Sequence, residues 1–369
     1  MNKLDMIRLA GLFLSLDQYP DRMERVRKKV SLPDFSPDEF IRTCSDHLVL
    51  QTLYCRLRDH GPEGLTGPSL MEHLKLIHRM NQRRNEEIIS QAVELSQLLG
   101  EAGIVPVFLK GTGNLLDGLY ADSGERIMSD IDLLLEASQL DTAVNILTGA
   151  GYVAAEHKWG NPVKELHSPP LFHPAYQAGV EVHISPVPPP YNRRFPAELL
   201  LRDKREASNQ PGCFVPSDPH KLIHNFIHSQ LSNEGAGTGL LQLRDLYDLW
   251  KLSLRTDIGS ILPSIPYRSK AESYLLATAE IFEDPVHLPA RGGLRQRIYL
   301  FHFSSNNRYR WYYRIFRFLR TIFKLIFVRY LLNLPVMLFD GKKRKAALRK
   351  LKDRDWYKMH LSGIRKDLH

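Results

Sequence analysis

Two carboxylates interrupt an apolar run near the middle of the chain, and they constrain its fold more than any other feature. Asp130 and Asp132 are separated by one residue in the segment SDIDLLLE, which otherwise has the composition of a buried strand. Because side chains alternate between the two faces of a strand, both carboxylates emerge on the same face. Buried like charges repel each other, so the pattern predicts that a cation lies between them.

A third carboxylate, Glu181, lies in a second apolar run, GVEVHIS, 49 residues after Asp132. This run also has the composition of a strand, and carboxylate oxygens are ligands that hard divalent cations prefer. We therefore predict that Asp130 and Asp132 hold a divalent cation, with Mg²⁺ as the simplest choice. Glu181 could supply a third oxygen ligand, unless it is an exposed strand residue. A pair of ions is expected at such a site, and Mn²⁺ is the alternative.

A glycine-containing turn connects a predicted strand, 105–109, to a predicted helix, 112–120. Backbone N–H groups at the start of a helix bind anions, and glycine permits close approach. The sequence therefore predicts that Lys110, Gly111 and Thr112 hold phosphates; a tight turn whose lysine faces water is the alternative. Beside three carboxylates on neighbouring strands, this turn indicates phosphoryl or nucleotidyl transfer.

Three more polar residues are close to the carboxylates in the sequence. Arg126 and Ser129 precede Asp130 and are predicted to contact nucleotide. Arg126 could instead pair with the carboxylates themselves. His183 shares a strand face with Glu181, so it either orients that carboxylate or meets a substrate oxygen, unless it is a structural histidine.

Further polar residues recur on the predicted helices after the last strand. His224 and His228 are spaced as two histidines on one helix face, which is the geometry of a metal site. No acidic or cysteine partner is evident in the sequence, so we favour packing over zinc. Arg244, Asp245 and Asp248 follow, and they either close the cleft from the helical side or brace it.

The composition is that of a soluble globular protein, since 43% of residues are apolar and 25% are charged. A chain of 369 residues exceeds one ordinary core. Cys44, Cys55 and Cys213 lack metal-type spacing and indicate a reducing compartment, so we expect a cytoplasmic protein. The apolar run 9–16 is predicted as a core helix, and no uncharged stretch reaches the ~18 residues that span a bilayer.

The order of the predicted elements gives an α+β fold. We expect an N-terminal helical region at 1–103, a core at 104–190, a C-terminal helical domain at 191–290 that closes the cleft, and a basic tail at 291–369. The core combines helices with strands predicted at 105–109, 129–136, 152–157 and 171–184, the last containing a turn. The fold class is therefore a small mixed β-sheet flanked by N-terminal and C-terminal helical regions.

Local signals define several helices. Ser36 is predicted to cap one helix, with Glu39 three positions later. Apolar residues at helical spacing predict a long helix over 69–99 and a shorter one over 140–147. Residues 197–285 are predicted as helices again.

At the polar motifs the chain resembles an uncharacterised bacterial nucleotidyltransferase family with a polymerase-beta-type fold. The matching segments are an LKG turn at 109–111, the strand RIMSDIDLL at 126–134 and the strand EVH at 181–183. The similarity extends more weakly over 35–255, which includes the histidines and acidic residues of the later helices. In place of the Gly-Ser turn of the wider superfamily, this chain has Lys110 and Gly111.

The resemblance implies a Mg²⁺-dependent enzyme that moves NMP from an NTP onto a hydroxyl or phosphate acceptor. It also implies that Asp130, Asp132 and Glu181 are the catalytic residues and the metal ligands, and that the nucleotidyltransferase core contains them together with the phosphate-binding turn. The acceptor, the preferred NTP and the oligomeric state do not follow from the sequence. The alternative is a catalytically inactive protein of this fold that binds nucleotide, nucleic acid or an anionic membrane surface.

The C-terminal tail is strongly basic, with 21 Lys and Arg against 4 Asp and Glu over 291–369. Within 308–330, basic residues recur at helical spacing among aromatic and aliphatic ones, namely at Arg310, Arg314, Arg317, Arg320 and Lys324. A basic amphipathic helix suits an anionic membrane surface, or it packs on the acidic body of the protein. We give similar weight to two roles of the segment 308–352, which includes GKKRKAALRKLK: peripheral contact with a membrane and packing on the body of the protein. Binding of nucleic acid ranks behind both.

Overall fold

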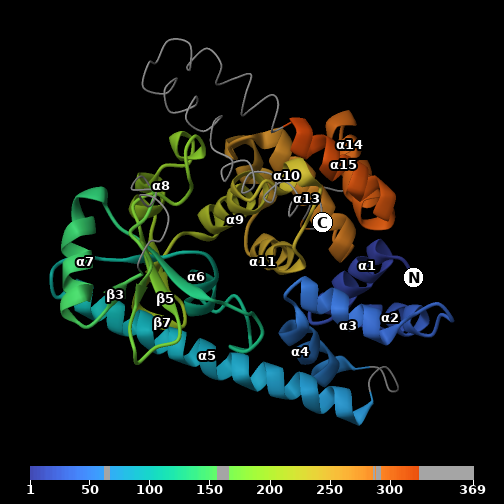
Figure 1. Cartoon of the computed structure of the whole chain (residues 1–369), viewed down its shortest axis with the longest axis horizontal. Coiled ribbons are helices and arrows are strands. Elements are labelled where there is room, and N and C mark those ends of the chain that lie inside the picture. The colour runs from blue at the N-terminus through green and yellow to red at the C-terminus, as the bar shows by residue number, and fades with distance from the viewer. Residues whose placement is uncertain (62–66, 156–165, 286, 288–291, 324–369) are drawn as a thin grey trace, which may run out of the picture. The chain divides into compact units, whose positions relative to one another are not determined.

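The computed structural model describes residues 1–61, 67–155, 166–285, 287 and 292–323. The chain forms two compact units, residues 1–300 and 301–369. The first unit has the predicted α+β fold, in which helices precede and follow a mixed sheet of seven strands (Figure 1). The finer division at residues 103, 190 and 290 stays a prediction.

The N-terminal helices pack around α1, whose residues are almost all buried. Residues 9–14 of the apolar run lie within α1, so this run forms a core helix as predicted. Ser36 caps α3 as predicted, because its hydroxyl accepts a hydrogen bond from the Glu39 N–H at 3.3 Å. The helices of this region are α1 (Lys3–Leu14), α2 (Met23–Val30), α3 (Pro37–Asp46) and α4 (Leu50–His60).

The long helix α5 (Pro68–Gly100) runs from α4 to the far side of the sheet (Figure 1). Its apolar stripe, which includes Leu74, Ile88 and Leu95, is buried, as the helical spacing predicts. Two buried asparagines on the same helix bind the loop that leads into the central strand. The Nδ2 atoms of Asn81 and Asn85 donate to the carbonyl oxygen of Arg126 at 3.0 and 2.8 Å. The helix therefore fixes the entry to the strand that carries the paired carboxylates.

The sheet places the D-x-D strand, β2, at its centre in the order β3-β4-β5-β2-β1-β7-β6. Strand β2 runs parallel to β5 and antiparallel to β1, and its register aligns Asp132 with Glu181. The bounds are β1 (Val107–Phe108), β2 (Asp130–Leu134), β3 (Val153–Ala154), β4 (Leu171–Phe172), β5 (Gly179–His183), β6 (Arg205–Ala207) and β7 (Gln210–Val215). Helices α6 (Lys110–Leu116) and α7 (Leu140–Gly149) complete this region.

The prediction of helices throughout 197–285 is wrong at 205–215. These residues form the hairpin β6–β7, and β7 pairs in parallel with β1 through Val107 and Phe214. The segment REASNQPGCFV lacks the alternation of a half-buried strand, and Pro211 with Gly212 interrupts it. The pairing with β1, and not the local pattern, determines these strands.

The remaining helices follow the hairpin. Helices α9 and α11 pack on each other, and Trp250 of α11 stacks on Phe282 of α13 at a centroid distance of 4.9 Å. The bounds are α8 (Ala197–Arg202), α9 (Asp218–Phe226), a π-helix (Ile227–Ser232), α10 (Gly235–Thr238), α11 (Leu243–Ser253), α12 (Ile258–Ile261), α13 (Arg268–Phe282) and α14 (Leu294–Arg308).

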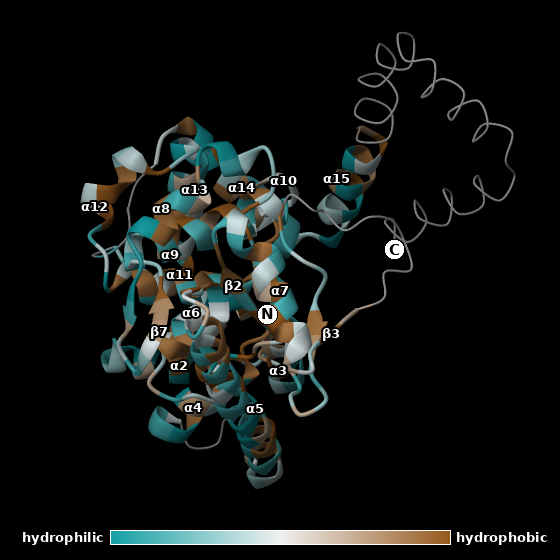
Figure 2. Cartoon of the chain, turned by 90° about the vertical axis from the view of Figure 1, so that its left-hand side faces the viewer, coloured by the Kyte–Doolittle hydropathy of each residue, from teal (hydrophilic) through white to brown (hydrophobic). Residues whose placement is uncertain are grey.

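In the second unit, α15 (Arg310–Phe323) is the amphipathic helix that the tail sequence predicts. Figure 2 shows both hydrophilic and hydrophobic residues along this helix. His302 packs against Phe316, while Trp311, Ile315 and Phe318 are 62%, 52% and 47% exposed. Lys324 and the GKKRKAALRKLK segment lie outside the described residues. Among the helices that the structure describes, none is long and apolar enough to cross a membrane.

Candidate active site

The register between β2 and β5 brings three predicted site residues together. Ligand atoms of Asp132, Glu181 and His183 all lie within 4.8 Å of one another. The side chains of Asp132 and His183 are each 4% exposed, and that of Glu181 is 24% exposed. Asp130 lies two residues before Asp132 on the same strand and faces a cavity. Asp132 and Glu181 therefore lie close together, whereas Asp130 is not part of this group among the described residues.

Two cationic or protonatable groups contact the same oxygen of Asp132. The Lys110 Nζ donates a hydrogen bond to Asp132 Oδ1 at 2.6 Å. The His183 Nε2 lies 2.8 Å from Asp132 Oδ1 and 3.4 Å from Glu181 Oε2. Burial raises the pKa of the Asp132 carboxyl, but Lys110 and His183 outweigh burial and hold this pKa well below its usual range.

The other two carboxyls have pKa values that shift in opposite directions. Burial, together with the negative charge of Asp132, raises the pKa of Asp130. Its oxygen Oδ1 accepts a hydrogen bond from the Ser129 hydroxyl at 3.0 Å. The hydrogen bond to His183 lowers the pKa of Glu181. The site therefore gathers three carboxyl groups beside one lysine and one histidine.

The lysine of the turn has a conformation that L-residues rarely adopt. Lys110 has φ of +49° and begins α6 directly after β1. Such a conformation costs on the order of 1–3 kcal/mol and persists only where neighbouring contacts enforce it. The turn is tied to β2 by the Leu109 N–H, which donates to the Asp132 carbonyl oxygen at 2.9 Å. The Thr112 hydroxyl donates to the Asp130 carbonyl oxygen at 3.2 Å.

Arg126 pairs with Asp248, whereas the sequence predicted contact with nucleotide or pairing with the carboxylates of the site. Its Nε and Nη2 atoms lie 2.9 and 2.8 Å from Asp248 Oδ2, on α11. The Tyr120 hydroxyl donates to Asp248 Oδ1 at 2.5 Å. A Cβ atom at Gly111 would lie 2.3 Å from Arg126 Nη1, so glycine at this position makes room for the guanidinium. Asp248 thus braces Arg126 from the helical side.

A cavity of about 210 Å³ opens beside the carboxylates. Residues from the turn, from the β2 strand and its lead-in, and from the C-terminal helices line it. They are Lys110, Gly111, Asn114, Arg126, Met128, Ser129, Asp130, Asp132, Pro216, Lys221, His224, Asn225, His228, Arg244, Asp245 and Asp248. Glu181 and His183 adjoin Asp132 but do not line the cavity, and neither does Thr112. The helical residues that the sequence singles out therefore do face the D-x-D strand.

The chain belongs to a nucleotidyltransferase family. The family model, described as uncharacterised nucleotidyltransferase, matches residues 33–264, which include all the residues of the cavity. The crystal structure of an antigenic nucleotidyltransferase-like protein from Paracoccidioides brasiliensis is similar at a TM-score of 0.36 and 15% identity. That similarity covers 54% of this chain and 89% of the other. No curated protein sequence matches.

His224 is buried and His228 is half-buried, and both are neutral at pH 7. Burial lowers the pKa of His224 to about 3 and that of His228 to about 4. The His224 Nε2 lies 2.8 Å from the Pro186 carbonyl oxygen and donates to it. Metal binding through this nitrogen would break that hydrogen bond. The pair therefore provides a neutral wall opposite the carboxylates.

Three polar residues of the cavity are absent from the sequence-based prediction, namely Asn114, Lys221 and Asn225. Lys221 is buried and binds Asp117, while Asn225 Nδ2 donates to the Asp245 carbonyl oxygen at 3.0 Å. Lys221 lies three residues before His224, and Asn225 lies three residues before His228, so all four share one helical face. Helical periodicity around the histidines could therefore have identified two of the three.

A second group with metal-ligand spacing lies away from the nucleotidyltransferase cavity. Ligand atoms of Cys55, His78 and Asp122 are within 4.8 Å of one another. The Asp122 carboxylate already has four partners: His78 Nε2 and the Gly124 N–H at Oδ1, and Arg58 Nη1 and Cys55 Sγ at Oδ2. Because these donors satisfy both oxygens, we interpret the group as a structural contact between α4, α5 and the loop before β2.

Proposed function

We propose that this chain is a Mg²⁺-dependent nucleotidyltransferase that transfers NMP from an NTP to a hydroxyl or phosphate acceptor. One observation carries the proposal. Adjacent parallel strands align Asp132 with Glu181, and the Lys110 ammonium lies on Asp132 where a cation is required. Buried carboxylates at this spacing are costly unless a cation compensates them.

The residues at the site fit a divalent metal. Asp130, Asp132 and Glu181 offer hard oxygen donors, which suit Mg²⁺ and also Mn²⁺. The Lys110 ammonium is a stand-in for such a cation, because it binds the oxygen of Asp132 that a metal would use. When bound, a pair of ions would polarise the transferring phosphate and activate the attacking oxygen. We propose the three carboxylates as the ligands.

The roles of the neighbouring side chains follow from their contacts. Glu181 accepts the proton of the acceptor hydroxyl, and His183 orients it from 3.4 Å. Lys110 and Arg126 line the cavity and direct positive charge to the phosphates of the NTP. Gly111 admits Arg126, and Ser129 lies at the cavity beside Asp130. We assign Thr112 to the nucleotide-binding turn through its hold on β2 rather than through phosphate contact.

The test is metal-dependent turnover with α-labelled NTPs and a mixture of protein, sugar, lipid-precursor and RNA acceptors. We expect label transfer in Mg²⁺ or Mn²⁺ and no transfer when the metal is chelated. The variant Asp130→Asn/Asp132→Asn should lose more than the roughly 10–100-fold that removal of an outer partner of a metal ligand costs. The variant Lys75→Met, at a surface ion pair on α5, should keep full activity.

The alternative is a catalytically inactive protein that keeps the fold and binds nucleotide or another anionic partner. The observation in its favour is that Lys110 and His183 compensate Asp132 without a metal. Nucleotide binding without any labelled product, unchanged by the double Asp→Asn variant, would support this alternative and contradict the transferase.

A second candidate function is peripheral contact with an anionic membrane surface through α15. Its exposed Trp311, Ile315 and Phe318 lie beside an arginine-rich face, which suits insertion at a lipid interface. The full chain should co-sediment with anionic vesicles, and Ile315→Ser should weaken this more than Leu294→Ser, which changes an exposed leucine of α14. Equal pelleting of both variants and the parent chain would contradict the candidate. We propose a cytoplasmic location in either case, with nucleic acid as the less favoured partner.

A further inference from the structure

The Lys110 ammonium binds Asp132, and under the proposed function it also binds a phosphate of the NTP. We propose that Lys110 is a resident counter-ion that exchanges between these positions, so that metal and nucleotide enter the site together. Without ligands its ammonium compensates Asp132; with both ligands bound it compensates a phosphate. The inference rests on the proposed function for the identity of the ligands.

The Oδ1 atom of Asp132 has no free lone pair for a metal ion. This atom contacts both Lys110 Nζ, at 2.6 Å, and His183 Nε2, at 2.8 Å. A carboxylate oxygen has two lone pairs, so these contacts use the capacity of this atom. A metal ion that takes this oxygen must displace one of the two groups.

Of the two groups on Asp132 Oδ1, Lys110 can move away and His183 cannot. His183 lies within β5, and its side chain is only 4% exposed. The Lys110 side chain is 25% exposed and lines the cavity. Lysine has a flexible four-carbon stem, whereas the shorter His183 side chain is packed in the protein interior. The ammonium is therefore the group that metal binding displaces.

Once displaced from Asp132, the Lys110 ammonium needs another anion as its partner. Within the cavity, Asp130 would be occupied by the metal that displaces Lys110, Asp248 is paired with Arg126, and Asp245 is paired with Arg244, at 2.8 and 3.2 Å for the two pairs. A phosphate in the cavity supplies negative charge within reach of the same side chain. Metal without nucleotide leaves Lys110 uncompensated, and nucleotide without metal leaves Lys110 on Asp132. The two ligands therefore bind with positive coupling.

The backbone restricts this exchange to the side chain. Lys110 has φ of +49°, and hydrogen bonds on both sides of the turn keep it there. The Leu109 N–H donates to Asp132 O at 2.9 Å, and the Gly113 N–H donates to Leu109 O at 3.0 Å. The Cα atom of Lys110 thus stays beside β2 while the ammonium moves.

The experiment measures Mn²⁺ binding by electron paramagnetic resonance of the free ion, with and without a non-hydrolysable ATP analogue. In the full chain, Lys110→Met and Lys110→Gln should each bind Mn²⁺ alone on the order of tenfold more tightly than the parent chain, a typical coupling between sites. The analogue should tighten Mn²⁺ binding in the parent chain and have little effect in either variant. Lys75→Met removes a lysine paired with a glutamate at 3.4 Å on α5 and should behave like the parent.

Thermal unfolding provides a second readout that needs no turnover. The Lys110 variants should be less stable than the parent without metal and should gain more stability from Mn²⁺. Equal or weaker Mn²⁺ binding in both Lys110 variants, or an undiminished effect of the ATP analogue, would overturn the exchange. Failure of the parent chain to transfer NMP would instead overturn the proposed activity, while a coupled Mn²⁺ titration would leave the exchange standing.

Discussion

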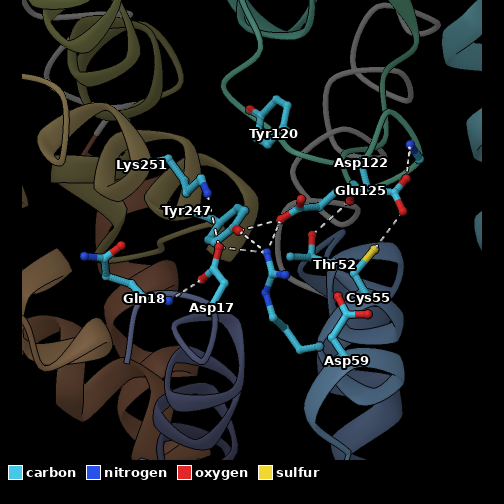
Figure 3. Close-up of polar contacts among 12 residues, drawn as sticks. Asp17, Gln18, Thr52, Cys55, Asp59, Tyr120, Asp122, Glu125, Tyr247 and Lys251 are labelled. Atoms are coloured by element: carbon cyan, nitrogen blue, oxygen red, sulfur yellow. Dashed lines mark hydrogen bonds and ion pairs between the residues drawn. The ribbon is translucent and has the colours of Figure 1, made fainter. Parts of the chain in front are cut away.

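Two clusters of charged side chains in the first unit, each with a buried centre, have opposite designs. The site cluster consists of Asp130, Asp132 and Glu181 with Lys110 and His183. The brace cluster consists of Arg56, Glu125, Tyr247, Asp17 and Lys251. It joins α4, the loop before β2 and α11, and Figure 3 labels its members other than Arg56.

The brace cluster is balanced and complete. Arg56 Nη2 lies 2.6 Å from Glu125 Oε1 and 3.2 Å from Asp17 Oδ2, and the Tyr247 hydroxyl donates to Glu125 at 2.5 Å. Lys251 adds a second cation beside Asp17 at 3.2 Å, so the cluster has two cations for two carboxylates. The residues that line the site cavity include none of its members.

The site cluster differs in both respects. The site has three carboxylates but only one lysine, which contacts Asp132, and one histidine, which contacts Asp132 and Glu181. Asp130 and Asp132 face the cavity. Burial of unbalanced charge is costly, so a fold that keeps such a cluster keeps it for a ligand of opposite charge. The comparison teaches that buried charge alone does not mark a binding site, whereas an excess of one sign beside a cavity does.

The largest expected effect is on the brace cluster. Arg56→Met leaves Glu125 buried at 1% exposure without its cation and should lower the free energy of unfolding by about 3–5 kcal/mol. Arg58→Met, two residues later on α4, breaks pairs of a 41% exposed side chain and should cost at most about 1 kcal/mol. Urea denaturation of both variants measures the difference. Similar losses in the two would show that the brace cluster does not stabilise the fold as a closed unit.

A smaller effect is expected where the site cluster meets its turn. Gly111→Ala places a Cβ atom 2.3 Å from Arg126 Nη1 and 2.9 Å from Met128 Sδ, so Arg126 must shift away from Asp248. Overpacking of this kind should cost about 1–3 kcal/mol of stability and should also weaken nucleotide binding. The test pairs thermal unfolding with titration of a labelled ATP analogue.

Gly100→Ala is the matched control for this prediction. Gly100 is the last residue of α5, and a Cβ atom there would meet nothing within 4 Å. This substitution should leave nucleotide binding unchanged and raise stability by up to about 1 kcal/mol. If Gly111→Ala behaves in the same way, Gly111 has no role in placing Arg126.

The sequence predicts the site cluster better than the brace cluster for a physical reason. Alternation along one strand places Asp130 and Asp132 on a common face, and this local pattern survives in β2. The position of Glu181 beside Asp132 requires the register between two strands, which the resemblance to a family implied and strand alternation alone could not. Local patterns thus predict which residues share a face, but not which faces meet.

Pairs that are distant in the sequence leave no such pattern. Arg56 and Glu125 are 69 residues apart, and Arg126 and Asp248 are 122 apart. Each member looks like an ordinary surface charge until the fold brings its partner close. The hairpin β6–β7 was missed for the same reason, because its strands depend on pairing with β1 and carry little alternation of their own.

The pH dependence of stability sharpens the comparison at the site. Burial opposes protonation of His183, but its hydrogen bonds to Asp132 and Glu181 outweigh burial and raise its pKa above 6.5. The stabilisation by protonated His183 is therefore fully present below pH 6.5 and is lost as the pH rises through the folded-state pKa. We expect metal-free protein to lose this stabilisation as the pH rises over this range.

The measurement compares thermal unfolding of the parent chain and of His183→Gln at pH 6 and above pH 8, with chelator present. The advantage of the parent should shrink at the higher pH. His73→Gln, at an exposed position of α5, removes a histidine outside the site and should not change the pH dependence. A constant difference between the parent and His183→Gln across this range would show that His183 does not compensate the carboxylates through its charge.

The smallest effect separates the two aspartates of β2. Burial and the charge of Asp132 raise the pKa of Asp130, so its ionised form disfavours folding above that pKa. At neutral pH without metal, Asp130→Asn should therefore stabilise the fold by about 0.5–1 kcal/mol, in the range of single stabilising substitutions. Asp132→Asn should destabilise it, because Lys110 and His183 lose the carboxylate that they compensate. Mn²⁺ should raise the melting temperature of the parent chain above that of both variants. Stabilisation by both substitutions, or by neither, would mean that the two carboxylates are equivalent and that the site cluster does not divide into a compensated and an uncompensated anion.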